Sequence, residues 1–248
     1  MQRAAILFLL AALHAVAHAA CQSGLAERLH EKLEPRRALI HELTVCDAWH
    51  GQLGRSVVVL PSPGDSPGTL DLEVLVVQQP DNGNSERSIV VARQRRTITS
   101  GGSDAMTVSD IEFDTARYRL STQLQSFGLR IYRRSAAADQ PASSETLTLY
   151  ALGRGNELRL LLDEFEIRRE RGRWGPGCAG SFEKQERQLS VVHSGSGGGK
   201  GVADLQVRQT DWNSVNELQG EDCVESSERP RFRESTLRFD GGQYRAAN

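Results

Sequence analysis

The chain has 248 residues, of which 38% are hydrophobic and 25% charged, and its formal net charge is −2. These values fit a soluble globular protein with one large domain or two small ones. Because 30 basic residues stand against 32 acidic ones, the composition lacks the basic excess typical of proteins that bind nucleic acids or anionic membrane surfaces.

The N-terminus has the pattern of a secretory signal peptide. Arg3 precedes an apolar run, and Ala17-His18-Ala19 fits an A-x-A cleavage site. We therefore expect a signal peptide over 1–19 and a periplasmic location. A lipid on Cys21 is the alternative, but a lipoprotein signal needs an aliphatic residue where His18 stands. No run of about twenty apolar residues predicts a transmembrane segment.

Four cysteines predict disulfides, because an exported protein meets an oxidising compartment. They are Cys21, Cys46, Cys178 and Cys223. Of the three possible pairings we favour Cys21–Cys46 with Cys178–Cys223, because each closes a short loop within one half of the chain. Each bridge would add about 3–4 kcal/mol of stability by restricting the unfolded chain.

Residues 20–40 are expected to form a short helical segment, and residues 41–248 a single all-β domain. Leu25, Leu29 and Leu33 recur at helical spacing and make one apolar stripe. After this segment the apolar residues alternate with polar ones, which is typical of half-buried antiparallel strands.

The alternation is clearest in three stretches, at 69–77, 203–209 and 234–240. Turn residues separate such stretches: Asn82-Gly83 predicts a two-residue type I′ turn, and Gly241-Gly242 a second bend. The predicted fold class is therefore mainly β, built from antiparallel meanders.

Two stretches share the frame S-x-[I/L]-x-F-D-x-x-x-Y-R, starting at Ser109 and at Ser235. The strand and loop patterns before them also match, so we divide the domain into three repeated units, 46–119, 120–177 and 178–248. Three units are too few to close a propeller of four to eight blades. We expect blade-like meanders arranged as a stack or a sandwich, each shared frame forming a closing hairpin.

Two short motifs resemble functional loops and fail in their context. Around Ser66, GDSPG matches G-x-S-x-G, but Pro67 has no N–H for an oxyanion hole, and a strand follows where a helix is required. At 194–201, SGSGGGKG lacks the first glycine of a P-loop and the Ser or Thr after Lys200. We interpret both as loops between strands.

Metal-binding side chains gather at 41–50 without a recognised ligand spacing. They are His41, Glu42, Cys46, Asp47 and His50. The segment 80–86 departs from the calcium-loop pattern. We predict neither a metal site nor a cofactor.

Asp114 and Asp240 hold the same place in the shared frame and, with Glu164, are the carboxylates considered for hydrolysis. The structural interpretation is that each Asp precedes a turn and accepts backbone hydrogen bonds. The basic stretch 164–174 is interpreted as a strand with a solvated face, with an acidic partner surface as the alternative.

Seven runs along most of the chain after the signal peptide carry a resemblance to a known family: CDAWHG, SVVVLP, LDLEVLVV, FGLRIY, ETLTLY, LRLLLDEFEI and TLRFDGGQY. In these runs the chain resembles a family of exported proteobacterial proteins without an assigned activity. The resemblance implies export and a β-rich fold, and it implies no site residues.

Because no catalytic set of residues passes these tests, we expect a non-catalytic periplasmic protein that binds a protein partner, such as an inhibitor or immunity protein. Two alternatives stay open: a carboxylate-dependent hydrolase of envelope polymers, and a structural envelope protein. The loops in which the units differ, 61–69, 135–144 and 194–201, are the expected places for function. No nucleic acid is expected as partner, and the oligomeric state is not predicted.

Overall fold

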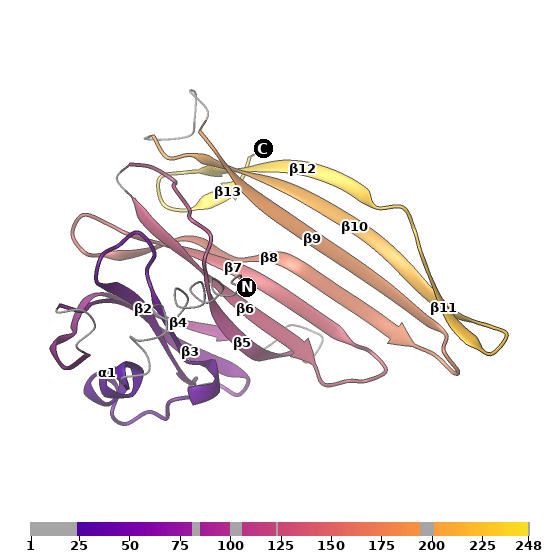
Figure 1. The fold of residues 1–248 in the computed structure, drawn as a ribbon, viewed down its shortest axis with the longest axis horizontal. Coiled ribbons are helices and arrows are strands. Elements are labelled where there is room, and N and C mark those ends of the chain that lie inside the picture. Colours follow the sequence, from indigo (N-terminus) through magenta and orange to yellow (C-terminus); the bar gives the residue numbers. More distant parts are fainter. Residues whose placement is uncertain (1–23, 81–84, 100–105, 123, 194–200, 248) are drawn as a thin grey trace, which may run out of the picture.

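The protein is mainly β, as the alternation predicts, with two antiparallel sheets and one short α-helix (Figure 1). The predicted signal peptide and the predicted Asn82-Gly83 turn lie outside the residues that the structure, a computed structural model, describes. Those residues are 24–80, 85–99, 106–122, 124–193 and 201–247.

The smaller sheet has four strands in the order β1-β2-β3-β4. Their bounds are β1 Val45–Ala48, β2 Arg55–Pro63, β3 Thr69–Gln78 and β4 Ile89–Thr99. Helix α1 (Leu25–Leu33) covers the outer face of this sheet, and the predicted leucine stripe packs there against alternate residues of β2 and β3. Two short 3-10 helices, η1 (His41–Leu43) and η2 (Ser85–Arg87), precede β1 and β4.

The larger sheet has nine strands in the order β13-β12-β10-β9-β8-β7-β6-β5, and β11 pairs with the end of β10. Their bounds are β5 Met106–Asp114, β6 Gln125–Ser135, β7 Ala142–Leu152, β8 Leu158–Trp174, β9 Gly180–Val192, β10 Asp204–Gln219, β11 Asp222–Ser227, β12 Arg231–Phe239 and β13 Tyr244–Ala246. Two of these strands are long: β8 has 17 residues and β10 has 16. At about 3.3 Å per residue, β8 runs for about 55 Å.

One half of the larger sheet is buried on both faces. In β7, Tyr150 and Leu152 belong to the core shared with the smaller sheet, while Leu147, Leu149 and Ala151 belong to a second core. Successive residues of a strand point to opposite faces, so the two cores lie on opposite sides of β7. The second core also holds residues of β10, β12 and β13.

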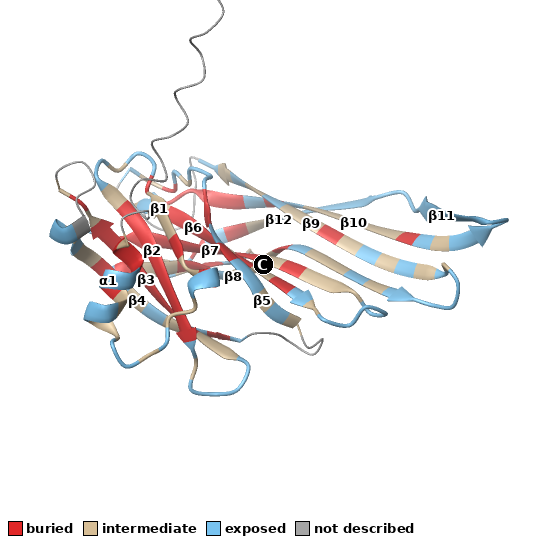
Figure 2. Ribbon diagram, turned by 60° about the horizontal axis from the view of Figure 1, so that its bottom comes forward, coloured by how far each residue is buried: buried red, intermediate tan, exposed pale blue. Residues whose placement is uncertain are grey.

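The other half of the larger sheet is a single layer, which we call the extension (Figure 2). Its segments are 168–174 of β8, 180–187 of β9, 208–219 of β10, the whole of β11, and 231–235 of β12. Among the described residues, the three cores contain none from these segments. The extension therefore keeps its shape through strand pairing and a covalent bridge.

That bridge is the predicted disulfide between Cys178, in the β8–β9 turn, and Cys223 of β11. It ties together two turns at the far end of the extension. Cys46 of β1 is also disulfide-bonded, and its predicted partner, Cys21, lies outside the described residues.

The predicted units do not coincide with the sheets. The first unit, 46–119, is divided, with β1–β4 in the smaller sheet and β5 at the edge of the larger one. Its copy of the shared frame is no hairpin, because irregular chain follows Asp114, whereas the second copy closes a hairpin between β12 and β13. The difference arises because residues 115–122 lie beside the second core, where Leu120 is fully buried.

Candidate functional site: the extension of the large sheet

The short motifs that resemble functional loops have the places expected of connecting loops. Ser66 is exposed in the turn between β2 and β3, where its carbonyl oxygen accepts hydrogen bonds from the backbone N–H and hydroxyl of Thr69. The strand β3 follows directly, so there is no strand-to-helix elbow. Residues 194–200 lie outside the described part of the chain.

The histidines and acids of 41–50 form no metal centre. His41 lies 3.8 Å from the carboxylate of Glu27 at the surface, and Cys46 is oxidised. Within the described ranges, no group of three or more His, Cys, Asp or Glu side chains has a geometry that could hold a metal ion. Most of the 80–86 segment lies outside those ranges.

Asp114 and Asp240 both accept turn hydrogen bonds, as the structural interpretation predicts. Asp114 accepts them from the backbone N–H of Ala116 and the Tyr118 hydroxyl. Asp240 accepts them from two backbone N–H groups and from Arg245. These bonds, the two backbone ones first, lower the pKa of Asp240 to about 2. A general acid needs the opposite shift.

Glu164 lies in a polar contact between the sheets. Its carboxylate accepts hydrogen bonds from Arg96 at 3.0 Å and from Arg133 at 2.8 Å, and Arg133 is almost fully buried. Each of the three carboxylates accepts hydrogen bonds from its own set of donors. The geometry thus gives no support to a pair of cooperating carboxylates.

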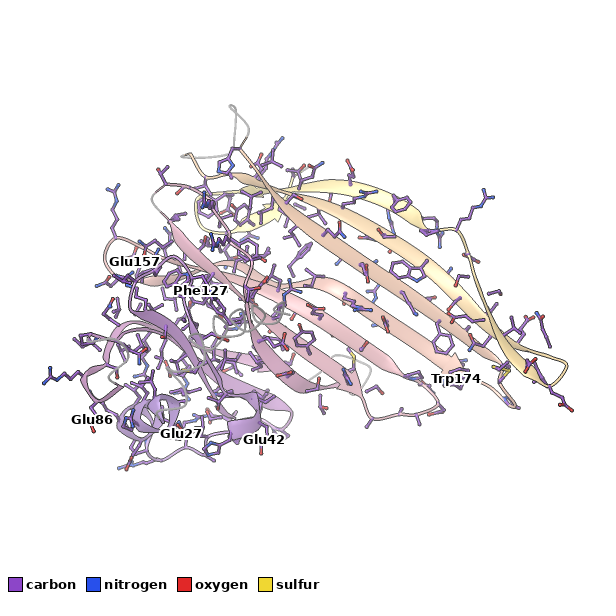
Figure 3. All side chains as sticks on the ribbon, in the orientation of Figure 1. Glu27, Glu42, Glu86, Phe127, Glu157 and Trp174 are labelled. Carbon is purple, nitrogen blue, oxygen red and sulfur yellow. A yellow bond between two sulfur atoms is a disulfide. The ribbon has the colours of Figure 1, made fainter. Side chains whose placement is uncertain are left out.

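The extension presents a different kind of surface, because aromatic side chains cross it in a diagonal line. The strand registers place four aromatic residues on one face, each two residue pairs along from its neighbour: Phe232 of β12, Trp212 of β10, Phe182 of β9 and Trp174 of β8. Diagonal neighbours of this kind are in reach of each other when the side chains are large. We call this side the aromatic face, and Figure 3 labels Trp174 at one end of the line.

A glycine in β8 lets the aromatic line lie close to the strands. Phe182 is opposite Gly172, and a Cβ at that position would come within 2.4 Å of the Phe182 ring. Trp174 meets the edge of the Phe182 ring with centroids 4.8 Å apart. Phe232 is 59% exposed and Trp174 40% exposed, so both ends of the line are open to a ligand.

A hollow of about 620 Å³ adjoins the aromatic line on the same face. Its walls include Phe182 and Tyr132, together with charged side chains of β7, β8 and β9 and residues of the 135–144 segment. That segment is one of the loops expected to carry function.

The charges beside the aromatic line neutralise one another. The registers place Arg168 opposite Glu186, Lys184 opposite Glu170, and Arg208 opposite Glu234. Arg208 also lies over the Phe232 ring, 5.3 Å from its centroid. The aromatic face is therefore apolar along its middle and nearly neutral around it.

The opposite side of the extension carries arginines and is called the arginine face. Its members on β8 and β12 are Arg169, Arg171, Arg173, Arg231 and Arg233. Between them Asp211 accepts hydrogen bonds from Arg233, Gln185 and Gln209. Burial alone would raise the pKa of Asp211, but these hydrogen bonds outweigh it and hold the pKa at about 2.

The aromatic line was not predicted from the sequence, although its four residues can be recognised there. Each aromatic residue stands alone among polar ones, in RFRES, TDWNS, GSFEK and RGRWG. Isolated aromatics of this kind also occur in half-buried strands, and only the pairing registers bring these four into one line.

The chain matches no family model, and searches of curated proteins and of solved structures found no similar protein. Among the described residues, no helix has the length and apolar character needed to cross a membrane.

Proposed function

We propose that this chain is an exported, non-catalytic binding protein whose aromatic face docks a protein partner. The observation that carries the proposal is the line of four aromatic side chains on a sheet half that no other described segment covers. Exposed aromatic groups of this extent are costly in a monomer and generally mark an interaction site. The resemblance to exported proteins and the disulfides support export.

The composition of the aromatic face favours a protein as its occupant. Aromatic residues and arginine are enriched at protein interfaces, and a few buried aromatic anchors dominate the binding free energy. The paired charges beside the line would attract neither a nucleic acid nor an anionic membrane, because both require an excess of positive charge. They suit the polar rim of a protein interface.

An inhibitor or immunity protein is the form of partner binding that we favour. A pre-formed, disulfide-fixed sheet binds with little ordering cost, which suits tight inhibition of another envelope protein. The hollow beside Phe182 and Tyr132 would accept a protruding side chain of the partner.

Photo-cross-linking tests the proposal. A photoreactive phenylalanine analogue replaces Phe232 or Trp174 in protein exported by a Gram-negative host, and Leu53, 98% exposed on the packed part of the molecule, is the control position. We expect the same discrete adduct from positions 232 and 174 and none from position 53. Adducts of equal yield at all three positions, or no adduct at all, would contradict the proposal.

The partner identified in this way is then purified and its affinity measured. Phe232→Ala is expected to weaken binding about thirtyfold, the typical loss for an interface anchor of about 2 kcal/mol. Leu53→Ala is expected to leave it unchanged. An unchanged affinity of the Phe232→Ala variant would remove the aromatic face from the interface.

A further inference from the structure

We propose that the arginine face is a second binding site, and that its ligand is an anionic saccharide chain, which carries carboxylate or phosphate groups on a hydroxylated polymer. The site lies on the opposite side of the extension from the aromatic face. It does not depend on the protein partner proposed above.

The arginines of this face stand in two rows. Arg169, Arg171 and Arg173 recur at every second residue of β8, so their side chains point to the same side. Arg231 and Arg233 form the second row on β12. Three strand spacings separate the rows, about 14 Å, so the face suits an extended ligand better than a single ion.

Several of these groups are held in position before any ligand arrives. Asp211 binds Nη2 of Arg233 at 2.6 Å, and the Arg233 side chain is otherwise 71% exposed. The carboxylate of Glu166 lies 3.3 Å from Arg169. Pre-positioned guanidinium groups bind carboxylate and phosphate well, because each presents two parallel N–H donors.

Other arginines keep their charge available. Neither Arg231 nor Arg173 forms an ion pair with a described residue, and both are exposed. On the two rows and between them, six arginines, Arg187 included, stand against Glu183 and Asp211, and Glu166 lies beside Arg169. The face thus has an excess of positive charge that the aromatic face lacks.

The two arginine rows are separated by β9 and β10, and we call the surface of these two strands on the arginine face the lane. Its side chains favour a saccharide over an acidic peptide. A hollow of about 560 Å³ lies there, and Glu183, Gln185, Asp211 and Asn213 are among the residues that line it. Their carboxylate and amide oxygens accept hydrogen bonds from hydroxyl groups. An acidic peptide offers these acceptors only its backbone N–H groups.

One buried acceptor in this lane lacks a donor. The Gln185 side chain donates to Asp211 at 2.7 Å, and its Oε1 atom accepts no hydrogen bond within the described part of the chain, although the residue is only 9% exposed. Buried carbonyl oxygens are normally paired. A saccharide hydroxyl would supply the missing donor to Oε1 of Gln185. To reach this atom it would displace the exposed side chains that surround Gln185.

The test compares dextrans that carry different charged groups or none, with an acidic peptide beside them. Binding of carboxymethyl dextran, dextran phosphate and unmodified dextran of equal length is measured by calorimetry, with poly-glutamate as the acidic peptide. We expect one or both anionic dextrans to bind, with affinity that falls as salt is added, and neither unmodified dextran nor poly-glutamate to bind comparably. The two anionic polymers distinguish a carboxylate from a phosphate ligand.

Single variants locate the binding. Arg231→Ala and Arg173→Ala are each expected to weaken it about tenfold, the usual loss for one charged hydrogen bond. Arg154→Ala removes an exposed arginine from the β7–β8 turn and is the control for net charge. Equal losses in all three variants, tighter binding of poly-glutamate, or no binding of either anionic dextran would overturn the proposal. None of these outcomes bears on the cross-linking test of the aromatic face.

Discussion

The two halves of the large sheet share strands β8, β9, β10 and β12, but they are stabilised in different ways. In the packed half, β7 buries nearly every side chain from Thr146 to Leu152, because a core lies on each of its faces. In the extension, every residue of β11 is exposed, and the residues of β10 beyond Arg208 are at most half-buried apart from Ser214. The β9–β10 ladder runs through both halves without interruption, whereas β8 pairs with β9 only in the extension.

In the extension, strand pairing sets the shape of the strands. In the packed half, the buried cores also stabilise them. A single-layer sheet gains little from the hydrophobic effect, since water reaches both of its faces. The extension therefore relies on a disulfide, cross-strand hydrogen bonds and aromatic contacts. Keeping large apolar groups exposed on such a structure makes sense when they serve binding, which is why we place function there.

The largest expected effect is the loss of a core aromatic group in the packed half. Phe127 contacts Trp49, Phe113 and Tyr150 in the core between the sheets. Phe127→Ala is expected to lower the free energy of unfolding by about 4 kcal/mol. Chemical denaturation of this variant is compared with that of Phe232→Ala in the extension, which should lose less than about 0.5 kcal/mol. Similar losses in the two variants would mean that the extension is packed in solution.

The next prediction concerns the disulfide, whose removal should affect the extension and not the packed half. Replacing both Cys178 and Cys223 by Ser frees two turns 45 residues apart in sequence. The chain-entropy model gives a loss of about 4 kcal/mol for a loop of this size. Because the bridge lies entirely within the extension, we expect amide hydrogen exchange to speed up in β9, β10 and β11 and to stay slow in β6 and β7. Uniformly faster exchange would show instead that both halves unfold as one unit.

The sequence predicted the fold class and the packed half well. Period-two alternation located strands such as β3, where Leu70, Leu72, Val74 and Val76 were expected on one face. The last three are fully buried, and Leu70 is half-buried. The alternation could not show that β3 is buried on its other face too. Asp71 and Glu73 are inside as well, because arginines of neighbouring segments form ion pairs with both.

The division into two sheets and the candidate site were beyond the sequence for a physical reason. Alternation looks the same whether the apolar face meets a core or meets water, so Trp212 and Phe182 resemble ordinary half-buried strand residues. Their alignment depends on registers between β8, β9, β10 and β12, which distant parts of the chain determine. For this reason the sequence pointed to loops as the place of function, whereas the surface that we propose lies mainly on strands.

The smallest effect concerns pH and Asp211, whose hydrogen bonds link three strands of the extension. Its pKa is about 2 in the folded protein against an ordinary value of 3.8 for an aspartate, so folding favours the charged carboxylate. The stability that it contributes is therefore present above pH 4 and is lost as the pH falls towards 2. The shift corresponds to about 2 kcal/mol. Asp211→Asn should remove this dependence.

The fluorescence of Trp212, the next residue in β10, can report the local change as the pH is lowered from 5 to 2. Trp49 lies in the core between the sheets and also fluoresces, so a Trp49→Phe background gives a cleaner signal from the extension. Asp240→Asn is the matched control, because Asp240 has a similarly low pKa but lies in the β12–β13 hairpin, outside the extension. We expect the acid transition of the extension to persist in Asp240→Asn and to disappear in Asp211→Asn. If both variants keep it, another group holds the extension together, and the stability of the single layer does not depend on the Asp211 contacts.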